Sequence, residues 1–291
     1  MGPYFPRQGD RWEWKMPDAS GIDPGKLDEA IAYAQAPANE GSPTDLGRHL
    51  VAQNTKEHDD GLLLGLTQFR GPMTGVVVRN GHLVAEWGDP HRVDMTFSVS
   101  KSFLSTVAGL LHDRGDLPDL DQPVHECVQD GGYDSDHNAQ ITWDHSLRQI
   151  SEWDGTLWDK HHSAGNPDDQ MLEPVTPGTR YEYNDVRVNR FALSLLRVLK
   201  RPLPDILRDE IMDPIGASNS WHWQGYANSW VDVDEARMQS VSGGGHWGGG
   251  MFINAYDQAR FGILCLCNGE WEGKQLISKD WIRLAKTPTE L

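Results

Sequence analysis

Runs of apolar residues in the first third of the chain predict one β-hairpin. Residues 75–79 and 82–87 are rich in β-branched and other apolar side chains, and Asn80-Gly81 separates them. This dipeptide favours a type I′ turn, because both of its residues tolerate a positive φ. We therefore predict two antiparallel strands joined by a two-residue turn.

Apolar residues spaced by three and four positions predict helices in other parts of the chain. Asp23-Pro24 is a typical N-cap and first-turn pair, and it begins the first predicted amphipathic helix. A second predicted helix runs from Ser98 to Leu111, with an apolar face broad enough for a buried position, and Gly115 ends it. Further helices are predicted near residues 188–199, 204–212 and 279–285.

The order of these elements predicts an α+β fold, because strands come first, helices follow and no βα alternation is present. The chain has 291 residues, of which 38% are hydrophobic, and we expect one domain over 1–291. Its α/β part takes residues 1–115 and 240–291, and a mostly helical and loop part takes 116–239. Within the latter, the polar stretch 116–169 is expected to cover one side of the core.

Charge and cysteine content narrow the class of protein. The chain holds 26 Lys and Arg against 43 Asp and Glu, so its formal net charge is −17. This charge disfavours nucleic acid and anionic membranes as partners. The cysteines Cys127, Cys265 and Cys267 favour buried thiols in a reducing compartment. No apolar segment suits a signal peptide or a membrane span, so we expect a soluble cytoplasmic protein.

Motifs for cofactors and metal ions are incomplete. Gly243, Gly245 and Gly248 fit G-x-G-x-x-G, but no βαβ unit is predicted around them. His161-His162 has no further ligand at metal-binding spacing and is predicted to lie at the surface. We therefore expect neither a cofactor nor a metal ion.

Chemistry is predicted at Ser98-Val99-Ser100-Lys101, an S-x-x-K motif at the start of the second predicted helix. Residues three apart share a helix face, so Ser98 Oγ and Lys101 Nζ can meet. The helix N-terminus favours negative charge at the serine, whose own N–H is a candidate oxyanion donor. We predict Ser98 as the nucleophile and Lys101 as its base. Alone, the motif also fits a capping serine and a surface lysine.

A second motif makes the first one specific. Downstream, Pro177-Gly178 leads into Tyr183-Asn184-Asp185. With S-x-x-K, this pattern resembles the β-lactamase-related serine hydrolases, a group that includes class C β-lactamases, DD-peptidases, family VIII carboxylesterases and 6-aminohexanoate-oligomer hydrolases. The resemblance implies a β-lactamase/transpeptidase-like fold, with an antiparallel sheet flanked by helices and a helical region beside it.

The resemblance also implies roles for single residues. Tyr183 falls on the tyrosine of the family motif Y-x-N, which contacts the nucleophile and shuttles protons with the lysine. Asp185 stands where the family usually has Asn, and it adds a carboxylate near Lys101. His246 and Trp247, set among glycines, are expected to face the substrate.

The resemblance extends over most of the chain, through residues 76–87, 141–155 and 243–266. The family closes its sheet with C-terminal strands, one of which carries K-T-G or H-x-G and half of the oxyanion hole. Lys286-Thr287-Pro288 imitates K-T-G, but Pro288 lacks an N–H and would break a strand. We therefore expect these strands to be missing from this chain, through truncation or because another chain supplies them.

The leading expectation is a serine hydrolase that cleaves small esters, in the manner of a carboxylesterase, through an acyl-enzyme on Ser98. An amidase acting on linear amides and a weak β-lactamase are alternatives. A catalytically deficient binding protein on the same fold is an alternative of another class. Twelve tryptophans suggest an aromatic wall that favours apolar acyl groups. The expected partner is a small ester or amide, and the oligomeric state is open.

Overall fold

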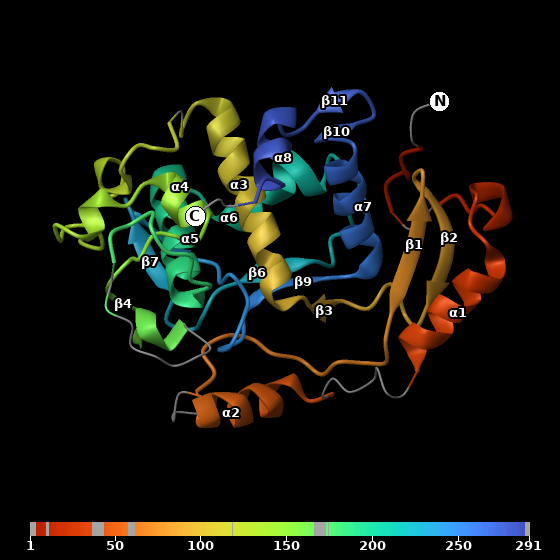
Figure 1. Cartoon of the computed structure of the whole chain (residues 1–291), viewed down its shortest axis with the longest axis horizontal. Helices are drawn as coiled ribbons and strands as arrows, with labels where there is room; N and C mark the ends of the chain where they lie inside the picture. The colour runs from red at the N-terminus through yellow and green to blue at the C-terminus, as the bar shows by residue number, and fades with distance from the viewer. Residues whose placement is uncertain are drawn as a thin grey trace.

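The computed structural model describes residues 4–9, 12–36, 44–57, 62–117, 119–165, 173 and 175–288. Helix α3 (Ser100–Arg114) runs through the middle of the molecule (Figure 1). It contacts α5 (Asp185–Leu199), α6 (Leu203–Leu207) and α8 (Lys279–Ala285). The fold is α+β, as predicted, with helices packed against short antiparallel strands.

Helix α3 is buried because its sequence is apolar on most sides. Phe103, Val107 and Leu111 are fully buried in the main core. Gly109 lets α8 approach, since a Cβ there would lie 2.5 Å from the Trp281 ring. Gly115 ends the helix with a φ of 82°, a left-handed conformation that suits glycine. The prediction for this helix is confirmed except at its start, where a 3₁₀ turn, η2 (Phe97–Val99), precedes α3.

The predicted hairpin is present with the predicted boundaries. Strand β1 (Gly75–Arg79) pairs antiparallel with β2 (His82–Trp87). Asn80 and Gly81 have φ values of 52° and 85°, as a type I′ turn requires. In Figure 1 this hairpin stands beside α7 (Ala255–Leu266), which it contacts.

A separate three-stranded sheet lies under the start of α3. Its central strand β9 (Gly250–Ile253) pairs antiparallel with β3 (Asp94–Met95) and with β6 (His222–Gln224). Three further antiparallel pairs complete the strands of the described residues: β4 (Thr156–Leu157) with β5 (Lys160–His161), β7 (Trp230–Val233) with β8 (Ala236–Gln239), and β10 (Glu270–Trp271) with β11 (Lys274–Gln275).

The sequence predicts that the polar stretch 116–169 covers one side of the core, but residues of this stretch are also part of the core. Val124, Tyr133, Ile141 and Trp143 are buried in the main core with the residues of α3 and α5. These apolar residues do not recur at helical or strand spacing, so the sequence pattern did not predict their burial. The stretch also forms a short helix and three 3₁₀ turns: α4 (Trp143–Leu147), η3 (Val124–Glu126), η4 (Asn138–Gln140) and η5 (His162–Gly165). Residues 118 and 166–169 lie outside the described residues.

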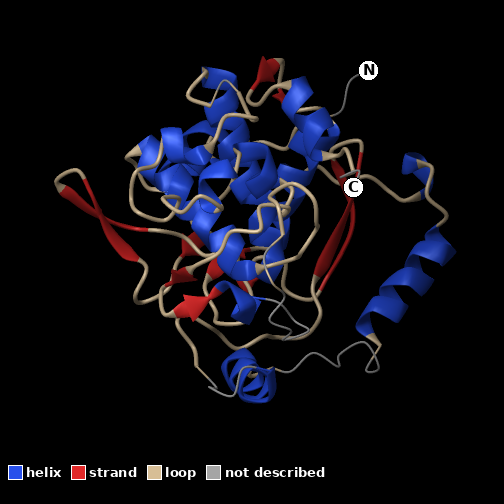
Figure 2. Cartoon of the chain, turned by 60° about the vertical axis from the view of Figure 1, so that its left-hand side comes forward, coloured by secondary structure: helices blue, strands red, loops and turns tan. Residues whose placement is uncertain are grey.

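The two N-terminal helices differ from what the sequence predicts, one in its packing and the other in its existence. Helix α1 (Pro24–Gln35) begins as predicted, with the Asp23 side chain accepting a hydrogen bond from the Lys26 N–H. It buries none of its residues and lies at the edge of the molecule (Figure 2). Helix α2 (Leu46–Glu57) was not predicted. Its Leu46 and Leu50 form a small second core with Met95 and Phe252.

The remaining predictions for helices hold with shifted boundaries. Helix α5 begins at Asp185, three residues before the predicted start, and α8 matches its prediction. The predicted helix near 204–212 divides into α6 and a π-helical turn, η6 (Arg208–Met212). The described residues contain no helix that is both long and apolar enough to cross a membrane.

The cysteines are free but less buried than the sequence suggested. Cys127 is exposed, and Cys265 and Cys267 are half-buried. Partial burial raises the pKa of the Cys265 thiol, with Lys286 acting in the opposite direction. The expectation of buried thiols is therefore wrong for Cys127.

Candidate active site

Ser98 lies in the 3₁₀ turn η2, where the chain passes from β3 into α3. The preceding residue, Phe97, has a φ of 51°, a left-handed conformation that is costly for an aromatic residue. Ser100 holds the turn in place: its Oγ donates to the Phe97 carbonyl at 2.6 Å and accepts from the Met251 N–H of β9 at 2.7 Å. The tight turn is therefore anchored to the three-stranded sheet.

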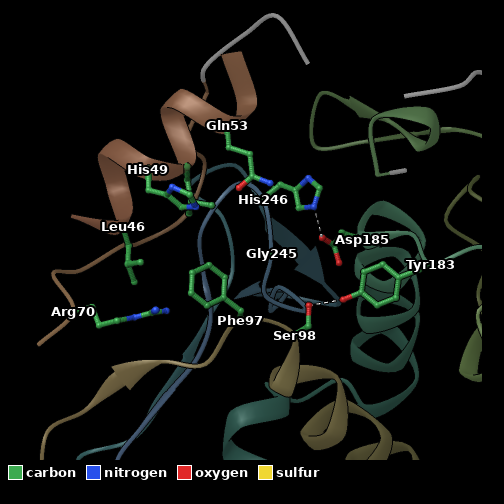
Figure 3. A pocket seen from close by; sticks show the side chains of 11 residues that line it. Leu46, His49, Gln53, Arg70, Phe97, Ser98, Tyr183, Asp185, Gly245 and His246 are labelled. Carbon is green, nitrogen blue, oxygen red and sulfur yellow. Dashed lines mark hydrogen bonds and ion pairs between the residues drawn. The ribbon is translucent and has the colours of Figure 1, made fainter. Parts of the chain in front are cut away.

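Two side chains converge on the Ser98 hydroxyl, and Figure 3 shows one of them, Tyr183. Lys101 Nζ donates to Ser98 Oγ at 3.0 Å, from one turn further along the helix. The Tyr183 hydroxyl donates a short hydrogen bond to the same Oγ from the segment before α5. Ser98 Oγ in turn donates to the Gly244 carbonyl at 3.4 Å. The structure thus brings together all three residues that the sequence predicted as catalytic.

Asp185 is the first residue of α5 and lies beside Lys101. Asn184 caps this helix by accepting a hydrogen bond from the Arg187 N–H, and this cap fixes the backbone at Asp185. Asp185 Oδ1 is 2.6 Å from Lys101 Nζ, and the two side chains are only 4% and 16% exposed. His246 Nε2 is 3.8 Å from Asp185 Oδ2.

Lys101 Nζ has four oxygen partners within 3.4 Å. Besides Ser98 and Asp185, its Nζ is 3.2 Å from the Gly244 carbonyl and 3.4 Å from that of Gly243. The same nitrogen lies over the Tyr183 ring, 4.8 Å from its centroid. An ammonium has three donors and no acceptor, so it can donate to three of these four oxygens at a time.

The glycine run Gly243–Gly245 fits tightly around these side chains. A Cβ on Gly244 would lie 2.1 Å from the Phe97 carbonyl oxygen, and one on Gly245 would lie 2.1 Å from Asp185 Oδ2. A Cβ on Gly243 would lie 2.5 Å from the Val188 side chain. These glycines are therefore explained by close packing at the site and need no dinucleotide.

A pocket of about 340 Å³ opens in front of Ser98. Helix α2 forms one wall, as Figure 3 shows. Leu46, Leu50 and Phe97 supply apolar surface to the pocket, and Arg70 reaches across toward Phe97. The remaining lining residues are His49, Gln53, Ser98, Tyr183, Asp185, Gly245 and His246.

The predicted aromatic wall is not present among the described residues. Trp247 is fully buried, and the Lys160 ammonium lies 5.0 Å from its ring centroid. It does not line the pocket, and neither does any other described tryptophan. Trp247 is thus part of the core, whereas its neighbour His246 lines the pocket.

A buried ion network holds the segment that carries Tyr183, and sequence reasoning missed it. Glu152 is fully buried, and its carboxylate lies 2.6 Å from Arg180 and 3.4 Å from Arg187. Gln149 accepts from the Glu182 N–H through its carbonyl and from the Asn184 N–H through its side chain. Both flanks of Tyr183 are therefore fixed. The signal was not visible in sequence because Glu152 is 28 residues from Arg180.

Other predicted residues lie elsewhere. Lys286 is in the C-cap of α8, where its Nζ donates to the Cys265 carbonyl, and the segment 286–288 does not line the pocket. His161 and His162 are not isolated, because Asp154 lies beside both of them.

Comparison with known proteins assigns the family. The family model described as Beta-lactamase matches residues 66–290, which is most of the chain. The chain belongs to the beta-lactamase family. Members of this family are serine hydrolases that act on amides and esters. No match was found among curated proteins.

Solved structures of the beta-lactamase family share the fold at low sequence identity. A candidate beta-lactamase from Bacteroides dorei matches with a TM-score of 0.54 at 18% identity, over 74% of this chain and 65% of its own. An octameric penicillin-binding protein homologue from Pyrococcus abyssi matches with a TM-score of 0.54 at 15% identity, over 90% of this chain and 59% of its own. A candidate 6-aminohexanoate-dimer hydrolase from Bacillus anthracis matches with a TM-score of 0.50 at 16% identity, over 80% and 73%. The chain thus spans less than two thirds of the first and second of these proteins.

Proposed function

We propose that the chain hydrolyses small esters through an acyl-enzyme on Ser98. The observation that carries the proposal is the convergence of Lys101 and Tyr183 on Ser98 Oγ. A serine hydroxyl is a weak nucleophile until a neighbouring group takes its proton. Both neighbours reach the oxygen that would attack, and the pocket in front of it has room for a small acyl group.

In the proposed reaction, Ser98 Oγ attacks the substrate carbonyl carbon while its proton passes to Lys101 Nζ. Lys101 must be a neutral amine to accept it, and Asp185, at 2.6 Å, is the contacting group that can take a proton from the resting ammonium. The carbonyl oxygen becomes an oxyanion near the Ser98 N–H, at the start of a helical turn whose first N–H groups lack helical partners.

Tyr183 completes the first half of the cycle. Its phenolic proton passes to the departing alkoxide or amine as the carbon–heteroatom bond breaks, and the tyrosine recovers a proton from Lys101. Water then attacks the acyl-enzyme, gives a proton to the same base and releases the acid, and Ser98 regains its hydrogen. Lys101 and Tyr183, the two protein groups that exchange protons in this scheme, both contact Ser98 Oγ in the structure.

A linear amide is the second candidate substrate. An amine is a poor leaving group unless it is protonated, and the Tyr183 hydroxyl, which contacts Ser98 Oγ, is the proton donor proposed for it. The weak β-lactamase remains a third possibility within the same chemistry, and no contact of the described pocket favours it.

The test uses the full chain with p-nitrophenyl butyrate, butyric acid p-nitroanilide and a chromogenic cephalosporin, together with a fluorophosphonate label located by mass spectrometry. We expect the label on Ser98 and faster turnover of the ester than of the other two. A Ser102→Ala variant is the matched control, because Ser102 lies exposed on the same helix. Faster anilide turnover would establish the amidase instead. A folded protein that neither labels nor turns over any substrate would refute the proposed function.

The charge of the pocket suggests the kind of acyl group. Arg70 lies 5.8 Å from the Phe97 ring centroid, and its guanidinium has no ion pair within the part of the chain that the structure describes. The other cation near the reaction centre, Lys101, is already paired with Asp185. In a chain with net charge −17, an unpaired arginine in the pocket favours acyl groups that end in a carboxylate.

Replacing Arg70 by glutamine should therefore change selectivity. We expect kcat/KM for the p-nitrophenyl monoester of glutaric acid to fall roughly 10- to 100-fold, since a hydrogen bond to a charged group contributes roughly 1.5–3 kcal/mol. The value for p-nitrophenyl butyrate should stay unchanged. Arg48→Gln is the control, because Arg48 is exposed on α2 and pairs with Asp45. An equal loss for both esters would show that Arg70 does not recognise charge.

A further inference from the structure

Three potential metal ligands meet where the β4–β5 hairpin ends. Asp154 lies just before β4, His161 ends β5 and His162 begins η5. Neighbouring residues in a strand point to opposite faces, but here the chain leaves the strand between the two histidines. Their ring centroids are consequently only 4.1 Å apart, and both rings lie beside the Asp154 carboxylate.

The distances suit a common metal ion. Asp154 Oδ1 is 3.1 Å from His162 Nδ1 and 3.9 Å from His161 Nε2, and one ligand atom from each residue lies within 4.8 Å of the others. Tetrahedral Zn²⁺ holds nitrogen and oxygen ligands at about 2.1 Å, which separates any two ligands by about 3.4 Å. Small side-chain rotations therefore suffice to place all three atoms around one ion.

The second nitrogen of His161 is already supported. His161 Nδ1 accepts a hydrogen bond from the Ser163 N–H at 3.3 Å and is 2.9 Å from Ser163 Oγ, so Ser163 fixes the orientation of the ring whose Nε2 faces Asp154.

Hydrogen bonds from a buried side chain fix the backbone at Asp154. The buried Asn138 accepts from the Asp154 N–H at 3.0 Å and donates to the Asp154 carbonyl at 2.7 Å. The nearby cation Arg187 is balanced by ion pairs to Glu152 and Glu182. The Asp154 and His161 side chains are 50% and 47% exposed, so an ion can enter from solvent, whereas His162 is only 7% exposed.

We propose that Asp154, His161 and His162 bind one divalent transition-metal ion of the Zn²⁺ type, with a fourth position open to water. Two imidazoles and a carboxylate form a donor set that suits such ions and not Ca²⁺ or Mg²⁺, which prefer oxygen. The site lies outside the pocket of Ser98, but the two are linked: the His162 carbonyl accepts from Asn184 Nδ2 at 2.7 Å, beside Tyr183. The bound ion braces the segment that carries the tyrosine.

The test measures metal binding directly on full-length protein without an affinity tag. Zn²⁺ is titrated by calorimetry, and Co²⁺ is added separately, because its visible absorption reports four-coordinate geometry. We expect one ion per chain, and at least about tenfold weaker binding in His161→Ala and in Asp154→Asn. Both side chains are half exposed, so these variants should fold. His91→Ala is the control, because His91 is an exposed histidine elsewhere on the molecule.

Two results would overturn the site: a wild-type chain that takes up no Zn²⁺, or variants of His161 and Asp154 that bind it as tightly as the wild type. Six-coordinate Co²⁺ with unchanged affinity in the variants would place the ion on other groups. Since every readout is binding or a spectrum, the outcome does not depend on whether Ser98 is the nucleophile.

Discussion

Replacing Ser98 by alanine is expected to lower kcat/KM for p-nitrophenyl butyrate by at least about 10⁴-fold, because the acyl group then has no oxygen to which it can be transferred. The variant should fold, since Ser98 is only half-buried. Lys101 also keeps its ion pair with Asp185 when the hydroxyl is removed. Steady-state kinetics provide the measurement. Near-ultraviolet circular dichroism, which the twelve tryptophans make informative, checks the fold.

The exposed Ser102→Ala variant controls for the loss of a hydroxyl on the same helix and should retain wild-type kcat/KM. If Ser98→Ala hydrolyses the ester as fast as the wild type, Ser98 is not the nucleophile. Such a result would also remove the reason for placing Lys101 and Tyr183 in the reaction.

Replacing Lys101 by methionine is expected to have two separate effects. The loss of the proton acceptor should lower kcat/KM by roughly 10²–10⁴-fold, the usual contribution of a general base. The loss of the cation leaves the Asp185 carboxylate buried without its partner, which should lower the free energy of unfolding by about 3 kcal/mol. Kinetics and urea denaturation measure the two effects independently.

A second substitution separates stability from chemistry. In Lys101→Met combined with Asp185→Asn, the carboxylate is replaced by a neutral amide, so the free energy of unfolding should return toward that of the wild type while activity stays low. Recovery of activity in the double variant would contradict the role of Lys101 as base. No recovery of stability would show that the 2.6 Å ion pair is not what holds these two side chains.

Features that depend on neighbouring residues were predictable from the sequence. The turn at Asn80-Gly81 follows from the φ values that these two residues tolerate, and the start of α1 follows from the capping side chain of Asp23. The meeting of Ser98 and Lys101 follows from helical spacing alone. Each prediction needs only a few consecutive residues, and each is found in the structure.

Features that depend on distant contacts were not predictable in this way. Helix α2 has a polar sequence, and it is stabilised by placing Leu46 and Leu50 against Met95 and Phe252. Trp247 is indistinguishable in sequence from a residue of a binding wall, and only the packing around it shows that it is buried. For the same reason, Asp154 could not be connected with the two histidines before the hairpin was known.

The candidate site itself needed both kinds of information. The S-x-x-K spacing is local, but the identity of Tyr183 came from a family resemblance, because 82 residues separate it from Lys101. The buried Glu152, which fixes the segment of Tyr183, had no signal at all. A charged residue is normally predicted to be exposed. The burial of Glu152 is compensated by its ion pairs with Arg180 and Arg187.

The glycine run Gly243–Gly245 bears on how mutational data for this protein are interpreted. Each of the three would place a Cβ within 2.5 Å or less of a neighbouring atom, and those neighbours belong to the turn of Phe97, to Asp185 and to α5. A saturation mutagenesis map would therefore show these positions as intolerant as Ser98, although they contribute no reacting group. In this fold, intolerance to substitution identifies the glycines packed around Ser98 as strongly as Ser98 itself.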